Sequence, residues 1–146
     1  VVCSGSPEHH SNNFKSTNIT LIKATYNEMV YLYRNSSAVL IPLKFNYHAS
    51  GITTMLEAAA ARKPTIINLT PGLEDYGIDK KTCLFVPLND ETVFSNAINK
   101  LYSDESLSKY LTDNAYEYLS GEFNTDVYSR IYIDLSQELL KIKRKK

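Results

Sequence analysis

The sequence predicts an α/β fold in which a doubly wound parallel sheet is covered by helices on both faces and followed by C-terminal helices. Three observations support this. Short apolar runs alternate with segments of helical periodicity along residues 1–90. The apolar runs are nearly continuous, as expected for strands that are buried on both faces. After residue 90 the pattern is helical only. The length of 146 residues suits a single domain with a substantial core.

The first part of the chain contains the predicted strands and two helices. Tyr26–Arg34 is predicted to be a helix because Met29, Leu32 and Tyr33 recur on one side of it. Ile52–Ala61 is predicted to be a second helix, which packs closely through its four final alanines. The strands are recognised as short apolar runs bounded by turn or helical sequence. They are Val1–Cys3, Asn18–Ile22, Ala38–Ile41, Thr65–Asn68 and Leu84–Pro87.

Three further helices are predicted after the last strand, each marked by a residue that caps or stops a helix. They are Glu91–Tyr102 with Asp90 as its N-cap, a helix from Ser103 or Asp104 to about Leu119 with Gly121 as its stop, and a helix from Asn124 or Thr125 through Tyr128, Ile131, Leu135 and Leu139.

The charge of the chain is unevenly distributed. It has 16 basic and 16 acidic residues, but the last six residues hold five of the basic groups, which leaves 11 positive and 16 negative charges in the rest. That sign disfavours general nucleic-acid binding. The basic tail is a solvated end or, alternatively, a contact with anionic lipid. No stretch has the length of a transmembrane helix, and no signal peptide is recognised.

The cysteines and histidines give little sign of a metal site. Cys3 and Cys83 are too few and too far apart for a disulfide framework or a zinc motif, so both are expected to be buried in the core. His9 and His10 lie in a polar loop over Gly5–Thr17 that is expected to be exposed. No convincing cluster of metal ligands appears, and no metal or cofactor is expected.

The run His48–Ala60, between two predicted strands, is the segment most suggestive of function. Gly51 leads from a strand into a helix, so free backbone N–H groups of the helix can meet an anion. Thr53 and Thr54 add hydroxyl groups to the first turn. Glu57 follows one turn later and can accept hydrogen bonds from a hydroxylated group. These groups together suit a nucleotide diphosphate joined to a sugar.

Each residue singled out in this way also has an alternative without a functional role. Gly51 could form only a tight strand-to-helix turn, Glu57 could be a solvated helix residue, and His48 could be a loop histidine. Lys23 contacts the base or the phosphates or, alternatively, is only an exposed lysine. Glu74 and Asp75 line a sugar pocket or, alternatively, only cap a turn.

Four successive segments carry a resemblance to a known family: Tyr26–Leu43, Ser50–Ile67, Thr70–Tyr76 and Cys83–Asp90. Their order and spacing resemble the C-terminal, donor-binding half of a GT-B glycosyltransferase of the retaining group 1 class. The resemblance implies a Rossmann-like fold, one half of a GT-B fold, with residues 1–146 forming a single nucleotide-sugar-binding domain. Because the chain begins at Val1 within a strand-like run, it is expected to be a fragment without its N-terminal acceptor domain.

The resemblance also implies an activity. The complete protein would be a hexosyltransferase that transfers a glycosyl group, with retention, from a nucleotide-diphospho-sugar to a glycan or lipid-linked acceptor. Such enzymes generally need no metal, and the fragment alone is expected to be inactive. The expected setting is polysaccharide biosynthesis in the cytoplasm, with contact at the inner face of the membrane left open. The alternatives are a nucleotide-sugar epimerase of the same fold and a non-catalytic flavodoxin-like module, although Ser4–Pro7 lacks the acidic cluster expected for the latter.

The resemblance assigns roles within the motif. Glu57 matches the second glutamate of an E-x-x-x-x-x-x-x-E motif, which binds the ribose, whereas the first glutamate falls on Ala49. His48, Ser50 and Asn46 are the candidates for a replacement polar contact. No catalytic residue is assigned. The expected donor-binding residues are His48, Ser50, Gly51, Ile52, Thr53, Glu57 and Lys23.

Overall fold

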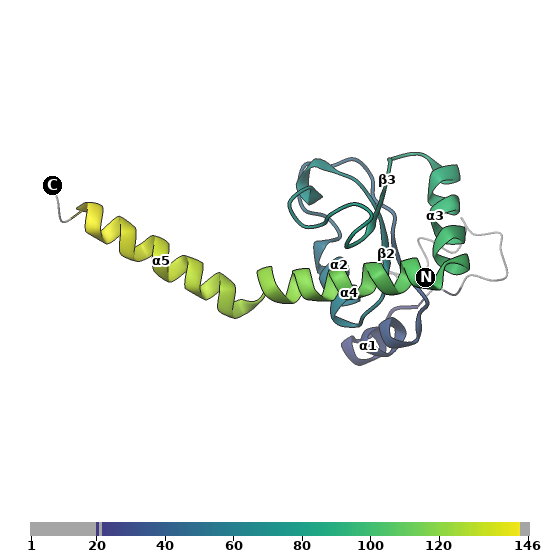
Figure 1. Cartoon of the computed structure of the whole chain (residues 1–146), viewed down its shortest axis with the longest axis horizontal. Coiled ribbons are helices and arrows are strands. Elements are labelled where there is room, and N and C mark those ends of the chain that lie inside the picture. The colour runs from purple at the N-terminus through teal and green to yellow at the C-terminus, as the bar shows by residue number, and fades with distance from the viewer. Residues whose placement is uncertain (1–19, 21, 144–146) are drawn as a thin grey trace. The chain divides into compact units, whose positions relative to one another are not determined.

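The computed structural model describes residue 20 and residues 22–143, and the chain divides into two compact units, Val1–Ser36 and Ser37–Lys146 (Figure 1). In the first unit α1 spans Tyr26–Asn35, in agreement with the predicted helix. The carboxylate of Glu28 caps it by accepting hydrogen bonds from the backbone N–H and the hydroxyl of Thr25, both at 2.7 Å. The predicted strand Val1–Cys3 and most of Asn18–Ile22 lie outside the described residues.

The second unit is built on three parallel strands in the order β1-β2-β3. They are β1 (Val39–Ile41), β2 (Thr65–Asn68) and β3 (Leu84–Val86), each within a residue of its predicted position. Leu40 pairs with Ile66, and Ile67 pairs with Phe85. The fold is therefore α/β and Rossmann-like, as predicted, and the carboxyl ends of the strands lie at one edge of the sheet.

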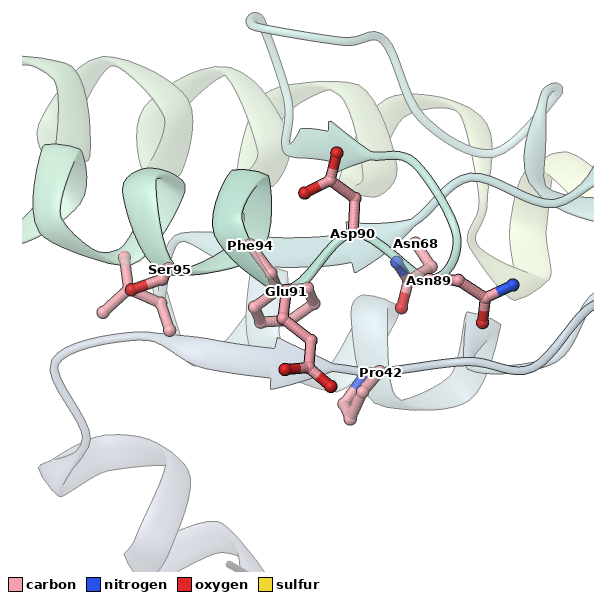
Figure 2. A pocket seen from close by; sticks show the side chains of 8 residues that line it. Pro42, Asn68, Asn89, Asp90, Glu91, Phe94 and Ser95 are labelled. Carbon is pink, nitrogen blue, oxygen red and sulfur yellow. The ribbon is translucent and has the colours of Figure 1, made fainter.

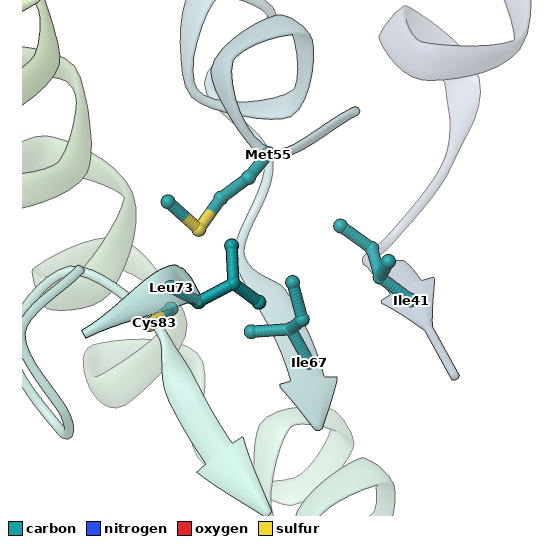
Figure 3. Packing of buried hydrophobic residues seen from close by; sticks show 5 residues of the cluster. All are labelled: Ile41, Met55, Ile67, Leu73 and Cys83. Atoms are coloured by element: carbon teal, nitrogen blue, oxygen red, sulfur yellow. The ribbon is translucent and has the colours of Figure 1, made fainter. Parts of the chain in front are cut away.

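The central strand β2 is buried on both faces. Ile67 faces α2 (Ile52–Ala60) and belongs to a cluster with Ile41, Met55, Leu73 and Cys83 (Figure 3). Ile66 faces the opposite layer, where it packs with Leu84, Val86, Leu101 and Leu111. Because successive strand residues point to opposite faces, a strand between two helical layers needs apolar residues at every position. The continuous run Thr65-Ile66-Ile67 meets that requirement.

The helices that follow the sheet are α3 (Glu91–Ser103), α4 (Glu105–Glu122) and α5 (Thr125–Lys143). The predicted cap Asp90 is confirmed, and of the paired alternatives the structure selects Asp104 over Ser103 and Asn124 over Thr125. Asp90 Oδ1 accepts a hydrogen bond from Val93 N at 2.9 Å, and Asp104 Oδ1 accepts one from Leu107 N at 2.8 Å. Asn124 Oδ1 does the same for the first amides of α5. No helix within residues 22–143 is both long and apolar enough to cross a membrane.

The predicted stop at Gly121 is wrong, because α4 continues through this glycine to Glu122. The physical reason is the packing of Phe123, whose ring lies 5.3 Å from that of Tyr76 and 5.6 Å from that of Tyr118 between centroids. These contacts accompany the end of the helix at Glu122, one residue beyond the glycine. A Cβ atom at Gly121 would meet nothing within 4 Å, so this glycine is not required by packing.

Helix α4 also packs against α2. Ala59 forms a cluster with Ala115 and Leu119, and Arg62 stacks its guanidinium 3.8 Å from the ring centroid of Tyr116. The expected close packing of the alanine run is confirmed for Ala58 and Ala59, which are buried, whereas Ala60 is exposed and α2 ends there rather than at Ala61. The contacts of α2 with the sheet and with α4 thus fix the position and the direction of this helix.

Candidate functional site

The motif loop between β1 and α2 turns sharply at Gly51, which is the N-cap of α2 and has φ +83°. A Cβ atom here would lie 2.8 Å from Ile41 Cγ2 and 3.3 Å from Ile67 Cδ1. Both the left-handed backbone and the close approach to the sheet therefore require glycine. The structure accounts for Gly51 as a tight strand-to-helix turn, and a phosphate contact through its N–H stays a prediction.

The first turn of α2 has unused hydrogen-bond donors. Met55 N donates to Gly51 O at 2.9 Å, whereas the N–H groups of Gly51, Thr53 and Thr54 find no acceptor among the described residues. No side chain among the described residues caps this helix, and no acidic residue lies in its first turn. Thr53 is exposed and Thr54 is half-buried. The N-terminus of α2 therefore offers free amides and the positive end of a helix dipole.

The polar residues before Gly51 form hydrogen bonds within the motif loop. Ser50 Oγ and His48 Nδ1 lie within hydrogen-bond distance at 2.9 Å, and Ser50 N donates to His48 O at 2.8 Å. His48 is exposed, and Ala49 is half-buried. Asn46 Nδ2 donates to Lys44 O at 2.8 Å, while its Oδ1 is buried without a partner among the described residues. All three candidates for replacing the first glutamate thus lie in one loop.

Gly72 packs against the backbone of the motif loop at His48 and Ala49. The sequence did not indicate this role. A Cβ atom at Gly72 would lie 2.4 Å from the carbonyl carbon of His48 and 2.8 Å from Ala49 N. The short helix Pro71–Leu73 therefore lies directly against the backbone of the motif loop. The preceding Thr70 is only 1% exposed, and its hydroxyl has no partner in the part of the chain that the structure describes.

The remaining predicted residues occupy different environments. Glu57 is half-buried one helical turn beyond Thr53, and Ile52 packs against the apolar cluster beneath α2. Glu74 and Asp75 are exposed after the Pro71–Leu73 helix. Lys23 is exposed and belongs to the first unit, so its role near base or phosphates stays a prediction.

A pocket of about 290 Å³ opens at the same edge of the sheet, on the side of α3 (Figure 2). Asn68 lies in its wall with Asn89, between the end of β1 at Pro42 and the start of α3. Asn68 Oδ1 accepts a hydrogen bond from Leu43 N at 2.9 Å, and its Nδ2 donates to Pro87 O at 2.7 Å. Asn68 is therefore a second residue that sequence reasoning missed. The sequence feature that could have identified Asn68 is its position as a polar residue at the end of an apolar strand.

The described residues show neither a reactive thiol nor a metal centre. Burial raises the pKa of the Cys83 thiol to about 12, so the group stays protonated at neutral pH. Cys83 is buried as predicted, whereas Cys3 lies outside the described residues. Among residues 20 and 22–143, no three His, Cys, Asp or Glu side chains gather in a way that could hold a metal ion.

Comparison with solved structures finds the same fold in glycosyltransferases. Sucrose-phosphate synthase from Thermosynechococcus elongatus matches with a TM-score of 0.70 and 22% identity, over 84% of this chain and 30% of that one. Anabaena HepE in complex with UDP-glucose matches with a TM-score of 0.70 and 14% identity, over 84% of this chain and 33% of that one. The C-terminal domain of a group 1 family glycosyl transferase from Francisella tularensis matches with a TM-score of 0.62 and 20% identity, over 73% of this chain and 53% of that one.

These similarities concern the fold, and the chain spans only about a third of the first of these proteins. The comparison with curated proteins found no match. The family model described as glycosyl transferases group 1 matches residues 8–118, which is more than half of the chain. The order of the sheet, the motif loop and α2 agrees with the resemblance carried by the sequence. The chain belongs to the group 1 glycosyltransferase family.

Proposed function

We propose that this chain binds a nucleotide-diphospho-sugar donor for retaining glycosyl transfer to a glycan or lipid-linked acceptor. The observation that carries the proposal is the N-terminus of α2, where the amides of Gly51, Thr53 and Thr54 have no acceptor among the described residues and lie at the carboxyl edge of the sheet. In open α/β sheets ligands bind outside this edge. HepE, a solved structure of the same fold, is in complex with UDP-glucose, which supports the choice of donor class.

The chemistry follows from the charge that develops during transfer. When the bond between the sugar and the diphosphate breaks, the leaving diphosphate gains negative charge. Amides at a helix N-terminus stabilise that charge without reorganising, which is the main electrostatic route to a lower barrier. In this proposal Glu57, one turn further along α2, accepts hydrogen bonds from the ribose hydroxyls. The loop over His48–Ser50 then faces the transferred sugar, where Ala49 supplies no carboxylate.

The finer parts of the assignment rest on the family and on sequence. They are the acceptor and its own domain, the absence of a metal requirement, a cytoplasmic setting in polysaccharide biosynthesis, and contact of the basic tail with the membrane. The epimerase and the non-catalytic module are not favoured by the matched family. Product analysis separates the alternatives, because an epimerase interconverts the donor sugar without an acceptor.

The proposal predicts that Glu57→Ala weakens donor binding in the complete protein. Titration calorimetry with UDP-, GDP- and ADP-linked sugars should reveal one preferred nucleotide for the wild type. Loss of the ribose contact should then cost about 1–3 kcal/mol, because the variant no longer pairs with the hydroxyls. Glu117→Ala, an exposed change in α4, is the matched control and should bind like the wild type. If no nucleotide-sugar binds the wild type, the proposed function is wrong; unchanged affinity in Glu57→Ala reassigns this residue to structure.

A further inference from the structure

We propose that Asn68 is a positioning residue that holds the motif loop, residues 42–51, in the geometry needed for the donor. The effect on the donor rests on the proposed function, whereas the effect on the loop does not. Asn68 is the last residue of β2 and is 6% exposed. It contributes no atom to the α2 N-terminus, so its influence passes through the loop.

The Asn68 amide joins the ends of all three strands. Its Oδ1 accepts from Leu43 N, just beyond β1, and its Nδ2 donates to Pro87 O, just beyond β3. Leu69 N extends the ladder on the same side by donating to Val86 O at 2.9 Å. The Asn68 side chain thus accepts a hydrogen bond from the β1 side and donates one to the β3 side, just beyond the point where backbone pairing between the strands ends. A buried amide in this position is fully specified by its two partners.

Leu43 connects Asn68 with Gly51, the residue that begins α2. Its backbone is held by Asn68, and its Cδ2 would lie 3.6 Å from a Cβ atom at Gly51. Gly51 begins α2 and carries the first of the unused amides. On the other side Gly72 lies against the loop backbone at His48. The loop is therefore held at both of its ends, by Asn68 near the strand and by Gly72 near the helix.

The variant Asn68→Asp separates positioning from simple packing, because the new carboxyl group changes its hydrogen bonding with pH. When protonated it has one O–H donor and one carbonyl acceptor, as the amide does, and both bonds can form. When ionised it still accepts from Leu43 N but cannot donate to Pro87 O, and it repels that carbonyl oxygen. Burial and this repulsion raise the pKa of the new group in the folded state, so the native arrangement is present at low pH and is lost as the pH rises.

The test is amide hydrogen exchange in the complete protein, with each variant compared with the wild type at the same pH. At about pH 8, the two loop amides with a hydrogen-bond partner, Leu43 N and Ser50 N, should exchange about tenfold faster in Asn68→Asp than in the wild type, with exchange over α4 unchanged. At about pH 5 the difference should close. Asn114→Asp is the matched control, because Asn114 Nδ2 also donates to a carbonyl, Tyr110 O, but on the exposed surface of α4. It should leave residues 43–51 unchanged at both pH values.

A second arm measures UDP-glucose binding to the same proteins. If the wild type binds, the dissociation constant of Asn68→Asp should rise about tenfold at about pH 8 and return to the wild-type value at about pH 5. Wild-type exchange in the loop at both pH values, or equal acceleration in α4, overturns the positioning role. Faster loop exchange with unchanged UDP-glucose affinity overturns its link to the donor. If the wild type binds none of the nucleotide-sugars, the proposed function fails, and the exchange arm still decides whether Asn68 positions the loop.

Discussion

The helices α2 and α3 both begin at the carboxyl edge of the sheet, but their N-termini are built differently. At α3, Asp90 accepts a hydrogen bond from Val93 N, and Glu91 adds a negative charge to the first turn. At α2 a glycine stands in the cap position, with no side-chain cap and no acidic residue in the first turn. One helix satisfies its own amides and dipole, while the other leaves them open.

The other α-helices of the described chain follow α3, whereas the short helix Pro71–Leu73 also lacks a side-chain cap. Glu28, Asp104 and Asn124 serve as caps for α1, α4 and α5. Leaving a helix end uncapped costs stability. In the proposed function, the diphosphate of the donor supplies the acceptor that α2 lacks among the described residues. The comparison teaches that what distinguishes α2 from α3 is the lack of a capping side chain and of an acidic residue in its first turn.

The largest expected effect comes from disturbing the support of the α2 loop. Gly72→Ala should lower the free energy of unfolding by about 2–3 kcal/mol, because the new Cβ atom would meet the His48 backbone rather than a flexible side chain. Gly121→Ala is the matched control, since it adds a methyl group in open space within α4. It should raise stability by up to about 1 kcal/mol through helix propensity. Chemical denaturation measures both. A mild or stabilising Gly72→Ala would mean that the loop does not depend on this close approach.

A smaller effect is expected from giving α2 the charge that α3 already has. Thr53→Asp places a carboxylate in the first turn of α2, which should raise the stability of the unliganded protein by about 0.3–1 kcal/mol. The same charge repels a diphosphate, so donor binding should weaken about tenfold.

The matched control for Thr53→Asp is Asp104→Ala, which removes the cap of α4 and does not line the pocket. It should lower stability by about 1 kcal/mol and leave donor affinity unchanged. Denaturation and calorimetry together check both variants. Equal donor affinity in Thr53→Asp and the wild type would argue that the phosphates bind elsewhere.

Features that depend on nearby sequence were predicted well. The three strands follow from continuous apolar runs, and the caps Asp90 and Asp104 from their position before apolar-periodic segments. Features that depend on distant residues were not. The end of α4 is set by Phe123 against Tyr76, far away in the sequence, so Gly121 gave the wrong stop.

The same distinction applies to the site. Gly51, Thr53 and Glu57 lie in one strand-turn-helix segment, and their spacing could be interpreted without a structure. Asn68 and Gly72 act on residues that a single sequence does not place beside them: Leu43 and Pro87 for the amide, and His48 for the glycine. A polar residue at the end of an apolar strand and a glycine after proline were visible, but their partners were not.

The central claim is that the open amides of α2 bind the diphosphate of the donor. The most direct test follows backbone amide chemical shifts in the complete protein during titration with UDP-glucose, or with whichever nucleotide-sugar the calorimetry selects. We predict that the amides of Gly51, Thr53 and Thr54 shift strongly and saturate together, while Val93 N, which is already bonded to Asp90, stays in place. Saturating binding that leaves these three amides unchanged, or that moves Val93 as much, would contradict the account.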